Sequence, residues 1–237
     1  MKEHIHTIPV LDALRNPQSC AFCVMHNRIE EKVVQFIMGP AYMEEDVRTE
    51  TNKTGFCGTH LAVMYGEQNR LGLALMLHTH MVQLNKALAL IVKNKLPSPL
   101  FGKDNSGPLG KIHSQLSKIN QTCYVCQKVE HTFSMYIGTF LHMWGKGGED
   151  AKIIRNQKGY CLPHFTQLVE MAAKDLGRSK RDLFLEDIVK PQLAHMKEME
   201  EDLDWFTLKF DHRFADEPWK NSKDALPRTL AMFGRKE

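Results

Sequence analysis

Apolar residues recur at every third or fourth position along most of the chain, which is the spacing of an amphipathic α-helix. One such stretch begins after Cys23 and meets a stop at Gly39-Pro40. A second begins after Cys126 and meets three glycines between positions 145 and 148. Because each stretch starts at a pair of cysteines, we expect both Cys-x2-Cys turns to lead directly into helices.

The longest periodic stretches lie later in each half of the chain. The first has apolar residues at alternating steps of three and four, the spacing of an antiparallel bundle or coiled-coil seam. Its seam consists of Ala74, Leu77, Met81, Leu84, Leu88 and Ile91. The second runs from Asp182 to about Phe210, and we expect Pro191 to kink it or to occupy its first turn. The sequence therefore predicts an all-α fold.

All six cysteines fall into two sets with the same spacing. Each set reads Cys-x2-Cys and then, after 33 or 34 residues, Cys-x2-His. The first set is Cys20, Cys23, Cys57 and His60, and the second is Cys123, Cys126, Cys161 and His164. The offset between the sets is 103 residues at the first two ligands and 104 at the last two, which indicates an internal duplication.

The duplication predicts two helical units packed with pseudo-two-fold symmetry. The first repeat would cover residues 1–96 and the second, with a C-terminal tail, residues 112–237. The stretch between them, 97–111, is rich in Pro, Gly and Ser and is the expected linker.

Three thiols and an imidazole in each set are the donors that tetrahedral zinc prefers. We therefore expect two zinc ions, each held within one repeat by ligands at the N-terminal ends of helices. A site with four protein ligands is closed, which favours a structural over a catalytic role. An iron–sulfur cluster on the same ligands is the main alternative. Disulfides would leave the histidines unexplained, and a thioredoxin-like redox pair would need a strand before its helix.

Two further groups of residues are candidates for function. Glu30 lies four residues after His26 on a predicted helix, so the two would form either a surface pair or a pair that supports a metal site, in which Glu30 would orient a ligand of the first site. The tail between 209 and 228 alternates charged and aromatic residues, a pattern that fits a segment docked on its own bundle by salt bridges. It would alternatively bind an anionic ligand or a protein partner through Lys209, Arg213, Trp219, Lys223 and Arg228.

Charge and composition narrow the range of partners. The formal net charge is +3, and two zinc ions with six thiolates would lower it further, so we expect no nucleic-acid partner. No run of 18 apolar residues is free of charge, and the N-terminus lacks the pattern of a secretory signal, so we expect no membrane partner either. A cytoplasmic location, where thiols stay reduced, is the expectation.

The chain also resembles an uncharacterised bacterial domain-of-unknown-function family, found mainly in anaerobic Firmicutes, over nearly its whole length. The resemblance rests on four motifs, located here at His4 to Pro9, Cys20 to Cys23 with Glu30, Gly55 to His60, and Lys209 to Arg228. Ala21 departs from the family pattern, which has proline there. The resemblance implies a small, all-helical, metal-binding protein and supplies no activity.

Three functions fit these expectations. The first is a non-enzymatic protein with two structural zinc sites that binds a partner or ligand. The second is a redox- or metal-responsive protein, in which the thiolates hold an iron–sulfur cluster or release zinc on oxidation. The third is an enzyme with an anionic-substrate site between the two halves or at the C-terminal tail.

Overall fold

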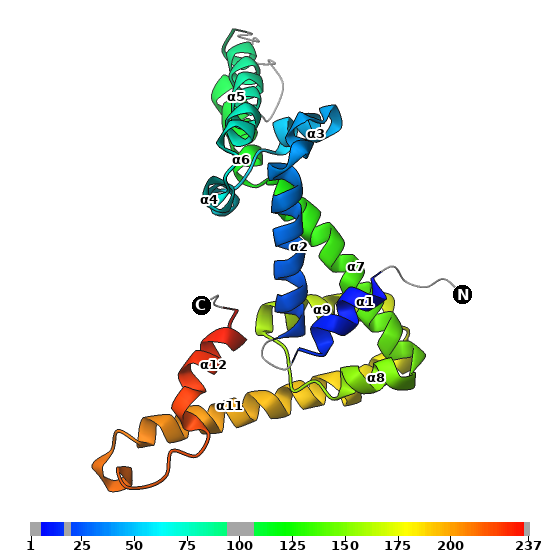
Figure 1. The fold of residues 1–237 in the computed structure, drawn as a ribbon, viewed down its shortest axis with the longest axis vertical. Helices are drawn as coiled ribbons and strands as arrows, with labels where there is room; N and C mark the ends of the chain where they lie inside the picture. Colours follow the sequence, from blue (N-terminus) through cyan, green and yellow to red (C-terminus); the bar gives the residue numbers. More distant parts are fainter. Residues whose placement is uncertain (1–5, 17–19, 94–106, 235–237) are drawn as a thin grey trace. The chain divides into compact units, whose positions relative to one another are not determined.

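The computed structural model describes residues 6–16, 20–93 and 107–234, and every regular element in these ranges is a helix (Figure 1). The prediction of an all-α fold is therefore confirmed. The first two predicted helices are α2 (Ala21–Met38), which ends immediately before Gly39-Pro40, and α7 (Tyr124–Lys146). Both begin at the residue that follows the first cysteine of a Cys-x2-Cys turn, as the sequence predicted.

The chain divides into two compact units that do not coincide with the predicted repeats 1–96 and 112–237. Unit 1 consists of residues 1–27 and 133–237, and unit 2 consists of residues 28–132. The boundaries fall inside α2 and α7, so each unit contains the first part of one of these helices and the last part of the other. Repeat spacing alone could not reveal this division, because it depends on which helices pack together. The internal duplication itself remains a prediction.

Unit 1 is built around aromatic side chains near the start of α2. Phe22, Phe133 and Phe140 are fully buried, and the Phe22 ring centroid lies 5.1 Å from that of Phe140 and 5.0 Å from that of Tyr160. The other elements of unit 1 are α1 (Thr7–Leu14), α8 (Gly148–Arg155), α9 (Leu162–Asp175), α10 (Arg178–Phe184), the π-helical turn η2 (Leu185–Val189), α11 (Lys190–Leu208), the 3-10 turns η3 (His212–Phe214) and η4 (Ser222–Asp224), and α12 (Ala225–Met232). Pro191 occupies the first turn of α11, which is one of the two positions expected for it.

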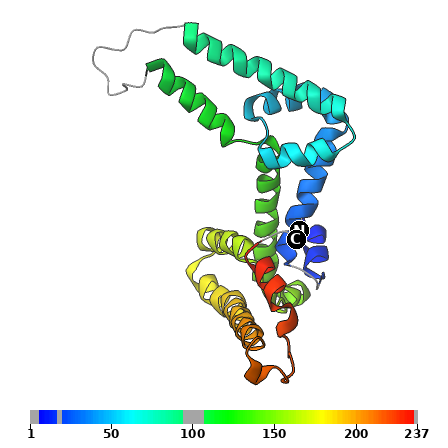
Figure 2. The same cartoon turned by 90° about the vertical axis from the view of Figure 1, so that its left-hand side faces the viewer.

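Unit 2 contains η1 (Pro40–Met43), α3 (Glu45–Thr54), α4 (Gly58–Gly66), α5 (Arg70–Lys93) and α6 (Gly107–Asn120). Arg48 holds α3 to α5, since its guanidinium donates to the Leu75 carbonyl at 3.1 Å and to Thr79 Oγ1 at 2.9 Å. Helices α5 and α6 lie side by side, as Figures 1 and 2 both show.

Two expectations concern the stretch between α5 and α6. Residues 97–106 of the predicted linker lie outside the described residues, as does the expected helix end at Leu96-Pro97. Residues 107–111 belong to α6 rather than to a linker. Gly107 starts this helix with a positive φ of 52°, which glycine adopts without strain.

No helix within the described ranges is long and apolar enough to span a bilayer.

Candidate metal centres

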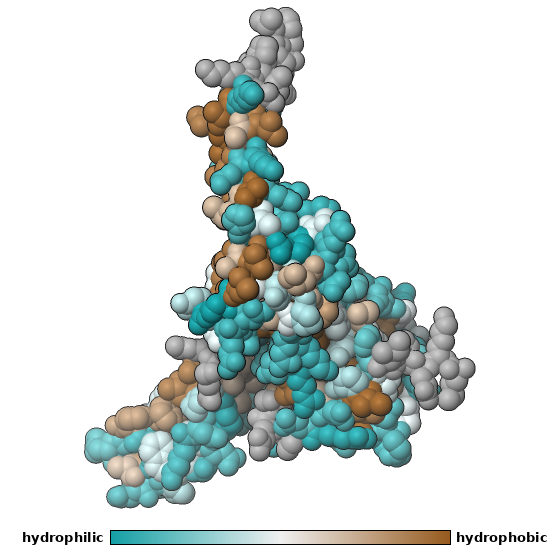
Figure 3. Space-filling model, turned by 45° about the horizontal axis from the view of Figure 1, so that its top comes forward, coloured by the Kyte–Doolittle hydropathy of each residue, from teal (hydrophilic) through white to brown (hydrophobic). Residues whose placement is uncertain are grey.

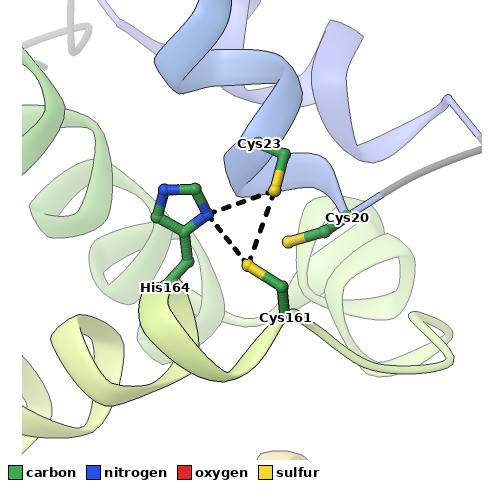
Figure 4. Close-up of side chains that lie close together, drawn as sticks. All are labelled: Cys20, Cys23, Cys161 and His164. Carbon is green, nitrogen blue, oxygen red and sulfur yellow. Dashed lines mark hydrogen bonds between the residues drawn. The ribbon is translucent and has the colours of Figure 1, made fainter. Parts of the chain in front are cut away.

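The first cluster of metal-binding side chains lies in unit 1 and is called site 1 here. It brings together Cys20, Cys23, Cys161 and His164 (Figure 4). His164 Nδ1 lies 3.4 Å from Cys23 Sγ and 3.1 Å from Cys161 Sγ, and the two sulfurs lie 3.5 Å apart. Cys20 points its sulfur toward the other three side chains. The site is therefore formed by the start of α2 and the start of α9.

The second cluster, site 2, lies in unit 2 and has the same composition. It consists of Cys57, His60, Cys123 and Cys126. His60 Nδ1 lies 3.2 Å, 3.4 Å and 3.3 Å from the sulfurs of Cys57, Cys123 and Cys126, respectively. The sulfurs of Cys57 and Cys126 are 3.9 Å apart. One histidine nitrogen thus faces three thiols, which is the arrangement of a Cys3His metal site.

The donor atoms fit a single tetrahedral ion. In each cluster the four donors lie within 4.8 Å of one another. Zinc–sulfur bonds of about 2.3 Å at tetrahedral angles place two sulfurs roughly 3.8 Å apart, close to the separations of 3.5 Å and 3.9 Å in the two sites. A disulfide would need about 2.05 Å, and all six cysteines are free thiols. Both clusters can therefore hold a metal ion.

The ligand sets differ from the predicted ones in how the half-sites combine. We expected Cys20 and Cys23 to join Cys57 and His60, and this pairing is wrong. Each Cys-x2-Cys turn instead joins the Cys-x2-His turn of the other repeat.

Local packing within each unit explains the exchange. In unit 1, Phe22 packs against Tyr160, so the first turn of α2 lies beside the turn that carries Cys161. In unit 2, the Tyr124 N–H donates to the Gly55 carbonyl at 3.0 Å, and Thr122 Oγ1 donates to the Thr54 carbonyl at 2.7 Å. These bonds fix the start of α7 against the turn that carries Cys57.

All four ligand turns lie at helix starts, as predicted. Cys57 and Cys161 are the N-cap residues of α4 and α9, and Cys20 and Cys123 directly precede α2 and α7. Burial opposes ionisation of Cys57, but hydrogen bonds from the backbone and side chain of His60 lower the pKa of this thiol to about 7. A sulfur at a helix N-terminus therefore becomes a thiolate, the form that binds metal, near neutral pH.

The electrostatics of site 1 favour a positive charge at His164. Burial alone would lower the pKa of this imidazole, but hydrogen bonds to Cys161 and Cys20 raise it to about 9. A metal ion bound at Nδ1 has to displace the proton there. Metal uptake at site 1 is therefore coupled to proton release.

Each Cys-x2-His turn contains a glycine pressed against a histidine from a long helix. A Cβ atom at Gly55 would lie 2.9 Å from the ring of His80 on α5, and one at Gly159 would lie 2.5 Å from the ring of His195 on α11. Gly55 also has a positive φ of 63°. The glycine in GFCGTH and GYCLPH is thus required by close approach, and at Gly55 by backbone conformation as well.

Glu30 contacts the histidine ligand of site 2. Its Oε1 lies 3.0 Å from His60 Nε2, on the side of the ring opposite the thiols. The residue 103 positions later, Phe133, has its ring centroid 5.0 Å from that of His164 in site 1. A carboxylate behind one histidine therefore corresponds to an aromatic ring behind the other. A carboxylate in this position fixes the tautomer and increases the basicity of a metal-bound imidazole.

Replacing the carboxylate should weaken metal binding at site 2 alone. Glu30→Gln is expected to lower the metal affinity of site 2 by about 10–100-fold, because His60 loses a charged partner. Competition with a chromophoric chelator would measure the two affinities separately. Glu31→Gln, on the adjacent exposed residue, removes the same charge and should change neither affinity. An equal loss at both sites would contradict the assignment of Glu30 to site 2.

The structure separates the tail residues that the sequence grouped together. Lys209 is buried, and its ammonium donates to the carbonyls of Phe214, Ala215 and Glu217. Arg213 pairs at the surface with Asp211, with 2.7 Å between guanidinium and carboxylate. These contacts organise the tail itself, and the Trp219 ring likewise packs against Phe206 at a centroid distance of 6.0 Å.

Lys223 and Arg228 instead line a cavity of about 1110 Å³ in unit 1. Arg228 pairs there with Asp202 at 2.8 Å and with Asp224 at 2.9 Å. The remaining charged residues of the lining are Arg15, Lys158, Glu198, Glu201 and Lys220, and the metal ligands Cys20 and Cys161 also belong to it. The contribution of Arg15 and Lys158 was missed from the sequence, because both lie far from the tail and outside any motif.

Fold and site together define a class of protein: an all-helical chain with two Cys3His groups, each able to hold a metal ion. Within that class, the chain belongs to the family described as a family of unknown function (DUF6062), whose family model matches residues 1–236. No match to the chain was found among curated proteins or among solved structures.

Proposed function

We propose that this protein binds one zinc ion in each unit and that the two ions hold its helices together. The observation that carries the proposal is the donor set, three thiols and one imidazole nitrogen within 4.8 Å at each site. Soft thiolates with an imidazole in tetrahedral geometry select zinc over harder divalent ions. The spacing of the donors suits a single ion. A multi-iron cluster is larger and would hold its four ligand atoms further apart.

The structural role follows from where the ligands lie in the chain. Site 1 joins Cys23 to Cys161 and site 2 joins Cys57 to Cys123, so each ion links helix starts that are distant in sequence. Four protein ligands leave no open position for water or substrate. The thiols require a reducing compartment such as the cytoplasm to remain available.

Metal analysis of protein purified without oxygen tests this function. The expected result is two zinc ions per chain, no visible absorbance, and loss of cooperative thermal unfolding after the ions are removed with a chelator, because metal binding and folding are coupled. A brown protein with acid-labile sulfide would contradict the choice of metal. Unfolding that is the same with and without bound metal would contradict the structural role.

The cavity in unit 1 supports a second function, the binding of a small anion. Its volume of about 1110 Å³ is slightly above the roughly 300–1,000 Å³ of most ligand pockets, so it has room for a small anion. Arg228 is shared between the carboxylates of Asp202 and Asp224, and the whole lining has five cations against four carboxylates, a net charge of +1. Arg15, Lys158 and Lys223 have no ion pair within the described part of the chain, so the lining carries a surplus of positive charge available to a carboxylate or phosphate.

Inorganic phosphate and succinate are suitable probes for this cavity. We expect either anion to raise the melting temperature of the zinc-loaded protein relative to chloride at equal ionic strength. Lys158→Ala should remove the effect, whereas Lys146→Ala, on an exposed lysine outside the lining, should preserve it. Stabilisation that survives Lys158→Ala together with Lys223→Ala would contradict binding in the cavity.

A further inference from the structure

The cavity in unit 1 is lined by charges of both signs, and the two signs come from different elements. At the end of α1 and in the turn before α9, the lining includes two cations, Arg15 and Lys158, and no carboxylate. We call this part the cationic wall. On α11 the lining includes no lysine or arginine and has three carboxylates, which are those of Glu198, Glu201 and Asp202. We call this part the acidic wall.

The cationic wall is held together by a bond between the residues that precede its two cations. Gln157 Nε2 donates to the Leu14 carbonyl at 2.9 Å, so Arg15 and Lys158 each follow a residue of this contact. Both cations are exposed, and neither has an ion pair in the part of the chain that the structure describes. A carboxylate bound at this wall can accept charge-assisted hydrogen bonds from both of them.

The acidic wall is one face of α11 and meets the cationic wall at His195. The ring of His195 lies so close to the turn before α9 that a Cβ atom at Gly159 would be 2.5 Å from it. At about 1.5 Å per residue, Glu198 and Glu201 follow His195 along the helix axis by roughly 4.5 Å and 9 Å. Glu198 Oε2 has only a long contact of 3.9 Å with His195 Nδ1, and Glu201 has no ion pair among the described residues. Both carboxylates are available to an ammonium group.

The arrangement of the two walls suits a ligand that carries both charges a short distance apart. The ammonium nitrogen and the carboxylate carbon of an α-amino acid are about 2.5 Å apart. With a hydrogen bond of about 2.8 Å at each end, the protein groups that bind them are roughly 8 Å apart. This is of the same order as the distances of Glu198 and Glu201 from the contact between the walls. Because the lining has a net charge of +1, a ligand with one more carboxylate than ammonium groups balances it.

We propose that the cavity binds a zwitterion with a net negative charge, namely an acidic amino acid or a short acidic peptide. A carboxylate of the ligand contacts Arg15 and Lys158, its ammonium group contacts Glu198 or Glu201, and Lys223 remains for a second carboxylate. The inference rests on the proposed binding of anions in the same cavity and adds the ammonium group to it. Figure 3 shows that most of the surface of unit 1, in the lower half of the view, is hydrophilic, as suits a charged ligand.

Aspartate and succinate are matched probes, because aspartate is succinate with one hydrogen replaced by an ammonium group. Isothermal titration of the zinc-loaded, full-length protein should give a dissociation constant about tenfold lower for aspartate, since a hydrogen bond between charged groups is added. N-acetylaspartate, in which the ammonium group is blocked, should bind like succinate. Glycylaspartate distinguishes the two kinds of ligand: tighter binding than that of aspartate identifies a peptide, and weaker binding identifies a free amino acid.

Substitutions on the acidic wall test where the ammonium group binds. Glu198→Gln together with Glu201→Gln should raise the dissociation constant of aspartate to that of succinate, without weakening succinate binding. The control is Glu200→Gln with Asp204→Asn, which removes the same charge from exposed residues of α11 outside the lining and should change neither constant. Two zinc ions per chain and unchanged helical content would show that each variant is folded.

The outcomes separate this inference from the anion binding on which it rests. Equal affinities of the wild-type protein for aspartate and succinate would overturn the inference and leave the binding of anions in place. Aspartate binding that is unaffected by Glu198→Gln with Glu201→Gln would do the same. If neither compound binds, the proposed binding of anions is itself contradicted, and the inference fails with it.

Discussion

Protein with Cys23→Ser and Cys161→Ser together is expected to retain one zinc ion per chain, whereas protein with Cys23→Ser and Cys57→Ser should retain none. The first pair of substitutions falls entirely within site 1, and the second pair removes one thiol from each site. A Cys3His site that loses a thiolate loses both a strong ligand and its tetrahedral closure. Metal content measured after passage through a mild chelator would distinguish the two double variants.

The single variants provide the controls for this experiment. Cys23→Ser alone should already lose one ion, and adding Cys161→Ser should cause no further loss. If each repeat bound its own ion, the outcomes would be reversed, and Cys23→Ser with Cys57→Ser would be the combination that keeps one. The experiment therefore tests how the half-sites combine independently of which metal they bind.

Spacing in the sequence identified the ligands better than it identified their grouping. The eight residues stand out because thiols and histidines recur in register at an offset of 103 or 104. Two Cys-x2-Cys turns and two Cys-x2-His turns, however, can combine in two ways with the same ligand chemistry. The choice depends on packing, such as the contact of Phe22 with Tyr160, and helical periodicity carries no information about which apolar faces meet.

Helix positions were predictable because strong local signals bound them. Gly39-Pro40 follows the end of α2, and Pro191 sits in the first turn of α11, which are positions where these residues are enriched. The start of α6 was missed, since Gly107 and Pro108 read as part of a linker. Pro at the second position of a helix is compatible with its first turn, where no N–H partner is required.

In the tail, the pattern of charged residues did not predict which partner each cation contacts. Lys209 and Arg228 looked alike in the sequence, yet one is enclosed by backbone carbonyls and the other pairs with Asp202 on α11. A long, flexible cation can satisfy itself with either kind of partner, and the partner of Arg228 lies 26 residues away. By contrast, the sequence alone contains the difference between Glu30 and Phe133, because aligning the two repeats at their offset of 103 places these two residues at equivalent positions.

The largest expected loss of stability outside the metal ligands is for Gln192→Leu. The Gln192 side chain is buried, accepts from the Tyr160 N–H at 2.7 Å and donates to the Tyr160 carbonyl at 3.0 Å. Leucine fills similar space but leaves two buried backbone groups without partners, at a cost of about 1–3 kcal/mol each. Urea unfolding of the zinc-loaded protein would measure the change. Leu193→Gln, on the neighbouring exposed residue, should stay within about 0.5 kcal/mol of wild type.

The effect on metal binding should be confined to site 1, because Tyr160 immediately precedes Cys161. In site 2 the corresponding turn is held by the backbone, through the bond from the Tyr124 N–H to the Gly55 carbonyl. Gln192→Leu should therefore lower the zinc affinity of site 1 and leave that of site 2 unchanged, the opposite of the result expected for Glu30→Gln. If Gln192→Leu left both the zinc affinity of site 1 and the stability at their wild-type values, the turn before Cys161 would hold its shape without this side chain.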